Sequence, residues 1–132
     1  MKKFLTILSI IILSTVIVPF VQAKEIPFSQ GYSMCDSKPL ITLVTAKWSS
    51  SNQEVINEFK LLQQYFGTRF NYSIVDITLP QAQDYNKHFR IEQNLPYVMF
   101  YRNGGKVSRY LNRECASNAK SCLIPKIKSL IQ

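Results

Sequence analysis

Three cysteines are the side chains of this chain best suited to redox or covalent chemistry. Cys115 and Cys122 flank a polar loop, and Cys35 lies far from both in the sequence. A Cys115–Cys122 disulfide would close this short loop and add roughly 2–3 kcal/mol of stability. The same two residues could instead form a redox-active pair, because Arg113 and Lys120 would favour a thiolate. Cys35 is expected to be a buried or weakly exposed free thiol, with a link to another chain as the alternative.

The remaining polar residues give little basis for catalysis. His88 is the single histidine of the chain and stands among polar residues on an expected helix. One histidine with scattered cysteines does not make a metal site, so no metal and no cofactor are predicted. Asp76 and Asp84 stand apart at element ends, and there is no phosphate-binding loop or nucleophile elbow.

The N-terminus has the pattern of an export signal. A basic start is followed by the apolar stretch 4–18, by Pro19, and by a small-residue cleavage pattern that ends at Ala23. This pattern predicts a cleaved signal peptide over residues 1–23 and a bacterial periplasmic location. The alternative is an uncleaved anchor, since residues 4–21 are just long enough to span a bilayer. Membrane contact is expected only in that case.

The remaining 109 residues, 24–132, are enough for one independently folding domain. Its charge is uneven, because the last quarter of the chain carries seven basic residues against Glu114: Arg102, Lys106, Arg109, Arg113, Lys120, Lys126 and Lys128. A basic face favours acidic partners, although it could also serve solubility alone. Nucleic acid is not expected as a partner, since no binding motif is present.

The first half of this domain is expected to alternate strand and helix. Residues 24–39 contain Pro27, Gly31 and Pro39 without a clear period, and they predict an irregular lead-in with at most one short strand. Residues 40–45 are mostly apolar and predict a central strand. Ser51 and Glu54 form a capping-box pattern at the start of a helix. Its apolar face is predicted to comprise Val55, Phe59, Leu62 and Phe66, with Gly67 as its stop.

The second half adds a strand, a polar helix, a hairpin and a last helix. Residues 70–77 predict a strand, and residues 80–89 a polar helix with Pro80 in its first turn. Strands over 96–102 and 106–111 flank Asn103-Gly104, a pair that favours a tight hairpin turn. A last helix follows, with Pro125 in its first turn. The order β-α-β-α-β-β-α predicts an α/β fold with a mixed four-stranded sheet flanked by helices.

Two segments of this pattern resemble the thioredoxin family. A strand runs into Trp48 directly before a helix, and Asn94-Leu95-Pro96 opens a strand that reaches the hairpin glycine Gly104. In that family, Trp precedes a Cys-x-x-Cys motif at the helix start, and a cis-proline strand lies opposite. The resemblance covers about residues 40–131 and implies a thioredoxin-like domain over 40–132, with Leu95-Pro96 as the cis bond.

The departures from the family pattern concern its chemistry. Ser49 and Asn52 stand at the two cysteine positions, so the family's disulfide cannot form there. Leu43 stands where many members carry a buried acid that assists proton transfer. Dithiol exchange needs an attacking thiolate and a second thiol that resolves the mixed disulfide. The resemblance therefore implies a redox-inactive relative.

Binding is the function that could remain. In the family, the cis-proline strand pairs with extended segments, so Trp48 and Leu95 would give an apolar floor, and Ser49 and Asn52 polar contacts, beside Pro96. The expected partner is an envelope protein or an extended peptide. The first alternative is that Trp48 only packs and Pro96 is a relic of the fold. The second is an unconventional thiol-disulfide oxidoreductase that uses Cys115 and Cys122, or Cys35.

Overall fold

The computed structural model describes residues 23–132. The expected signal peptide therefore lies outside the described residues, except for Ala23 at its end. Within residues 23–132, no helix combines the length and the apolar composition that crossing a membrane requires.

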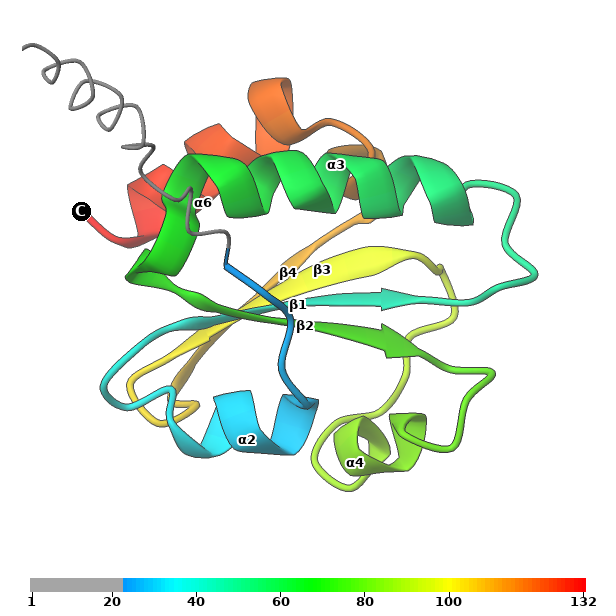
Figure 1. Ribbon diagram of the computed structural model, residues 1–132, viewed down its shortest axis with the longest axis horizontal. Coiled ribbons are helices and arrows are strands. Elements are labelled where there is room, and N and C mark those ends of the chain that lie inside the picture. The colour runs from blue at the N-terminus through cyan, green and yellow to red at the C-terminus, as the bar shows by residue number, and fades with distance from the viewer. Residues whose placement is uncertain (1–22) are drawn as a thin grey trace, which may run out of the picture.

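Four strands form one mixed sheet in the order β2-β1-β3-β4 (Figure 1). They are β1 (Leu40–Thr45), β2 (Asn71–Asp76), β3 (Tyr97–Arg102) and β4 (Val107–Leu111). β1 pairs parallel with β2 and antiparallel with β3, and β3 pairs antiparallel with β4. All six residues of β1 are buried, as expected of a central strand covered on both faces. The predicted α/β fold with a mixed four-stranded sheet is confirmed.

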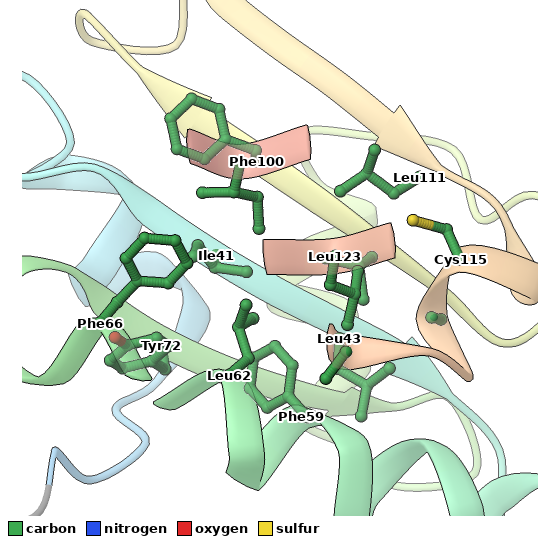
Figure 2. Close-up of a cluster of buried hydrophobic side chains, with 14 of the residues drawn as sticks. Ile41, Leu43, Phe59, Leu62, Phe66, Tyr72, Phe100, Leu111, Cys115 and Leu123 are labelled. Atoms are coloured by element: carbon green, nitrogen blue, oxygen red, sulfur yellow. The ribbon is translucent and has the colours of Figure 1, made fainter. Parts of the chain in front are cut away.

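Helices cover both faces of the sheet (Figure 1). α3 (Asn52–Phe66) and α6 (Ile124–Leu130) lie on one face, and α2 (Phe28–Ser33) and α4 (Ala82–Asn86) lie on the other. Figure 2 shows the core under α3, where Phe59, Leu62 and Phe66 pack over the strands. The predicted apolar face of α3 is confirmed, because Val55, Phe59, Leu62 and Phe66 are all buried.

The start of α3 differs from the prediction. Ser51 is the N-cap residue, but its side chain makes no capping hydrogen bond to the helix backbone. The capping box predicted for Ser51 and Glu54 is therefore wrong. The helix does end as predicted at Gly67, which has a φ of 59°.

The lead-in is more ordered than its sequence predicted. Residues 24–39 contain α2, and Glu25 forms a parallel bridge with Tyr72 at the outer side of β2. α2 is held by tertiary packing: the ring of Phe28 meets those of Tyr85 and Tyr101 edge-on, with centroids 4.9 and 5.8 Å apart. Such packing overrides weak local propensity, so the expectation of an irregular lead-in is wrong.

Gly31 lets α2 approach the sheet closely. A Cβ atom at this position would lie 2.7 Å from Cδ1 of Leu40, which is too close for two carbon atoms. The glycine that weakened the helical pattern in the sequence is thus what allows the helix to pack onto β1.

The second half follows its prediction with shorter elements. α4 occupies five residues rather than the predicted 80–89, and a loop leads from it to β3. Asn103 and Gly104 have φ values of 56° and 65°, as the predicted hairpin turn requires. After β4 come α5 (Arg113–Ala116), the π-helical turn η2 (Ala119–Leu123) and α6, which has Pro125 in its first turn as predicted.

Candidate functional site

The loop between β1 and α3 lies at the same end of the sheet as Pro96. Val44, near the end of β1, is paired with Tyr97 at the start of β3. Because β1 and β3 are antiparallel, the residues that follow β1 and those that precede β3 lie at the same end of the sheet. The Leu95-Pro96 bond is cis, as the family resemblance implies.

Trp48 is the most exposed large apolar side chain among the described residues, with 68% of its surface accessible. The alternative that Trp48 packs in the core is therefore wrong. Leu95 is 8% exposed and belongs to the core on the side of α2 and α4. Trp48 thus presents apolar surface to solvent, whereas Leu95 packs beneath the strand that follows Pro96.

Ser49 lies on the loop between β1 and α3, Asn52 is the first residue of α3, and short-range hydrogen bonds hold this segment. The Ser49 N–H donates to the carbonyl of Ala46, and the Asn52 N–H donates to that of Ser49, at 3.0 and 3.1 Å. The Thr45 hydroxyl donates to Oδ1 of Asn52 at 2.7 Å. This side-chain bond fastens the first residue of α3 to the end of β1, so Asn52 has a structural contact in addition to any contact with a partner.

The Ser49 hydroxyl has no base among its hydrogen-bond partners in residues 23–132. Among the described residues its partners are the Ser51 hydroxyl, at 3.4 Å, and the Ser51 N–H, which donates to it at 3.3 Å. Neither group is a base that could remove its proton. Leu43, at the position of the family's buried acid, is fully buried among apolar residues.

A disulfide joins Cys115 and Cys122 at this same end of the sheet, with Cα atoms 5.1 Å apart. Two side-chain hydrogen bonds fasten its loop. Oδ1 of Asn112 accepts from the Cys115 N–H at 3.0 Å, and Oε1 of Glu58 on α3 accepts from the Ala119 N–H at 2.7 Å. Cys115 is buried beside the core, close to Leu111 (Figure 2). Cys122 is half-buried and lines an open hollow of about 420 Å³.

Cys35 is a free, buried thiol, as the sequence predicted, and it lies at the opposite end of the sheet beside the turn between β3 and β4. Its carbonyl accepts from the N–H of Gly104, in the turn between β3 and β4, at 3.4 Å. Burial raises the pKa of the Cys35 thiol, so the protein disfavours its reactive thiolate. Its position keeps Cys35 away from the disulfide.

His88 is exposed beside α2, where its ring centroid lies 5.0 Å from that of Tyr32. Residues 23–132 contain no group of three or more His, Cys, Asp or Glu side chains arranged for a metal ion.

A network of buried tyrosines next to Pro96 was missed at the sequence level. The hydroxyls of Tyr85 and Tyr97 are 3.3 Å apart, and that of Tyr101 donates to Tyr85 at 3.5 Å. The Tyr97 hydroxyl also accepts from the N–H of Glu92 at 3.1 Å, which fastens the loop that leads to Pro96. Burial raises the pKa of all three phenols well above the usual value. The available signal was the i, i+4 spacing of Tyr97 and Tyr101, which puts both on one face of a strand.

Comparison with known proteins supports the fold. No family model and no curated protein matches the chain. Among solved structures, it is similar to a chain in the complex of ferredoxin:thioredoxin reductase with thioredoxin f2, at 14% identity and a TM-score of 0.65, covering 87% of this chain and all of the other. The Trx4 domain of ERdj5 matches at 15% identity and a TM-score of 0.61, covering 86% of this chain and 98% of that one.

Chloroplastic thioredoxin z matches at 18% identity and a TM-score of 0.56, with 85% of this chain and 99% of the other covered. All three likenesses are at low sequence identity, so they define a fold and not an activity. This protein has a thioredoxin fold.

Proposed function

We propose that this chain is an exported, periplasmic thioredoxin-fold protein that binds an extended segment of an envelope protein without dithiol exchange. The observation that carries the proposal is the exposure of Trp48 at the end of the sheet where β1 ends and β3 begins after Pro96. A large aromatic side chain left in solvent is a common anchor of protein–protein contacts. The signal-peptide pattern of residues 1–23 supports the location.

The binding mode follows from the backbone. An extended segment that lies beside Pro96 would add main-chain hydrogen bonds at the open end of β3, as in other strand-addition complexes. Trp48 would cover one apolar side chain of that segment, and the Ser49 hydroxyl would supply a polar contact. Because Ser49 has no thiol and no neighbouring base, the segment is held and released unchanged.

A cysteine trap tests this binding mode. The variant Ser49→Cys puts a single thiol in the loop, and the probe is a short extended peptide whose central cysteine is linked to thionitrobenzoate. The thiolate attacks the peptide sulfur, a new disulfide forms, and thionitrobenzoate leaves as a coloured product. If the site holds extended segments, the peptide reacts about tenfold faster than activated cysteine alone, because binding raises its effective concentration.

Two matched variants serve as controls. Ser33→Cys places the thiol at an exposed position on α2 and should show no preference for the peptide. Trp48→Ala added to Ser49→Cys should remove the preference, whereas Leu61→Ala, which truncates another exposed apolar residue, should keep it. Equal rates for the peptide and for activated cysteine at Ser49→Cys would contradict the proposal.

The alternative function is thiol-disulfide exchange by Cys115 and Cys122. One observation favours it: Cys122 lines an open hollow together with Tyr110, Asn118 and Lys126, so a partner could reach its sulfur. Catalysed reduction of insulin by dithiothreitol tests it. Turnover by the natural chain that disappears in Cys115→Ala/Cys122→Ala would establish the exchange activity and displace the binding proposal.

A further inference from the structure

The outer edge of β2 is paired over only part of its length. On its inner side β2 is bonded to β1 over all six residues. On its outer side the described chain offers a single bridge, between Glu25 and Tyr72, in which the Ile26 N–H donates to the Tyr72 carbonyl at 2.8 Å. The chain then turns away at Pro27 into α2 (Figure 1).

Open backbone groups follow this bridge. In a strand, the backbone N–H and carbonyl groups of successive residues point to opposite sides, so those of Ile74 and Asp76 point to the same side as those of Tyr72. The Asp76 carbonyl accepts from the Leu79 N–H at 3.0 Å. Within residues 23–132, no backbone hydrogen bond on this outer side engages the N–H or carbonyl of Ile74 or the N–H of Asp76. The edge therefore ends in a short stretch ready to pair with another strand.

A hollow of about 430 Å³ runs along this stretch, and we refer to it as the β2 edge groove. Its walls include the apolar residues Ile26, Pro27, Ile74 and Leu79, of which Leu79 is 39% exposed. Apolar side chains beside an open strand edge suit an extended segment, because such a segment presents side chains and backbone groups together.

The charge of the β2 edge groove is acidic. Glu25, Asp76 and Asp84 line it, and none of the described lining residues is basic. Each carboxylate has one oxygen in a hydrogen bond inside the protein: with Gln63 for Glu25, with Thr78 for Asp76 and with Ser29 for Asp84. These bonds hold the carboxylates in place, and none of these three partners carries a charge. The acidic lining contrasts with the chain as a whole, which has a net charge of +8.

We propose that the β2 edge groove binds an extended segment of a partner protein that carries lysine or arginine at alternate positions. The segment adds a short strand to β2 beyond Pro27 and pairs with the open groups of Ile74 and Asp76. Its basic side chains face the carboxylates of Asp76 and Asp84. The partner is a protein other than this one, because Lys126 and Lys128, the pair of basic residues at alternate positions in this chain, lie within helix α6 and not on an extended segment.

A peptide titration followed by NMR tests the proposal with the intact protein labelled with ¹⁵N. The probe is acetyl-Lys-Val-Lys-Val-Lys-amide. Saturable shifts are expected for the amides of Ile74, Val75 and Asp76 and for those of residues 25–28. Asp84→Lys replaces an attraction with a repulsion and should weaken binding about threefold to tenfold. Glu92→Lys makes the same charge change at an exposed residue outside the groove and should leave the affinity unchanged.

Backbone pairing is separated from charge by a second peptide. The same sequence with N-methyl groups at alternate residues keeps its lysines but loses the N–H donors of one edge, and it should not bind. Equal binding of the two peptides would overturn the proposal, because it would show charge attraction alone. So would shifts centred on Trp48 and Leu95, no binding at millimolar peptide, or self-association of the protein that Asp84→Lys abolishes, which would assign the groove to a second copy.

Discussion

Two loops at the same end of the sheet differ in whether they contain cysteines and in how those cysteines are bonded. The loop from β1 to α3 has Ser49 and Asn52 where the resembled family has cysteines, and it presents Trp48 to solvent. The loop from β4 to α6 has both of its cysteines, but they are joined to each other. The described disulfide therefore lies in a different loop from the one in which the resembled family carries its cysteines.

The two loops also differ in how firmly hydrogen bonds and burial hold them. The disulfide loop is fastened by Asn112 and by Glu58, and Cys115 is buried. The loop with Trp48 is fastened at its end, by the bond from Thr45 to Asn52, while its middle stays accessible. We refer to the disulfide loop as the clamp and, following the proposed function, to the loop with Trp48 as the contact surface. The following predictions test these two roles.

The largest change in the free energy of unfolding is expected at alkaline pH, and it comes from the buried tyrosines beside Pro96. Burial raises the pKa of Tyr85, Tyr97 and Tyr101, so above pH 10 only the unfolded chain loses these protons. The free energy of unfolding is therefore unaffected by them below pH 10 and falls above it. For three phenols the loss is about 4 kcal/mol at pH 11.

Urea unfolding at pH 8 and at pH 11 measures this loss. Tyr97→Phe removes one titrating group and should reduce the loss by about a third, at the cost of the bond to the Glu92 N–H. A stability that falls equally in the natural chain and in a variant with all three tyrosines changed to phenylalanine would contradict this assignment.

The second effect concerns the clamp. Cys115→Ala/Cys122→Ala should lower the free energy of unfolding by about 2.5 kcal/mol, because the loop is no longer closed in the unfolded chain. The comparison predicts that the peptide preference of the Ser49→Cys trap survives this change in conditions where the variant is folded. A disulfide-free variant with full stability would show that the disulfide does not act as a clamp. A variant that is folded but has lost the trapping preference would show that the two loops do not have separate roles.

A smaller effect is expected where the contact loop is fastened. Thr45→Val removes the hydroxyl that donates to Oδ1 of Asn52 and should cost about 1 kcal/mol of stability. Thr68→Val, at an exposed position, serves as the matched control in the same urea series and should change stability by less than about 0.5 kcal/mol. Equal losses in the two variants would mean that the bond to Asn52 does not fasten the loop.

The smallest stability effect belongs to Trp48. Because this side chain is 68% exposed, Trp48→Ala should change the free energy of unfolding by less than about 0.5 kcal/mol, while an interface anchor would cost about 2 kcal/mol of binding. Thermal unfolding and the trapping assay measure the two quantities on one sample. A large loss of stability with unchanged trapping would make Trp48 a structural residue.

Much of the fold could be predicted from the sequence because its signals are local. The periodic face of α3, the turn at Asn103-Gly104 and the short spacing of Cys115 and Cys122 each depend on residues near one another in the chain. The family resemblance also anticipated the cis bond before Pro96. These features needed no knowledge of distant contacts.

What was missed depends on contacts between distant segments. α2 has no helical period of its own and is held by Phe28 against rings from α4 and β3. The capping pattern at Ser51 was present in the sequence, but the serine contacts Ser49 instead of the helix backbone. The exposure of Trp48 was left open by the sequence, since a tryptophan at the end of a buried strand suits a core or a surface equally well.

The reduction potential of the Cys115–Cys122 disulfide tests the central claim most directly. The intact protein is equilibrated in a series of thiol buffers that differ in reduction potential. Its free thiols are then alkylated and its mass is measured. The binding account predicts a closed bridge down to potentials below about −300 mV, as in structural disulfides. A bridge that opens in a glutathione buffer near about −200 mV, or a glutathione adduct on Cys122, would contradict that account and mark the protein as an oxidoreductase.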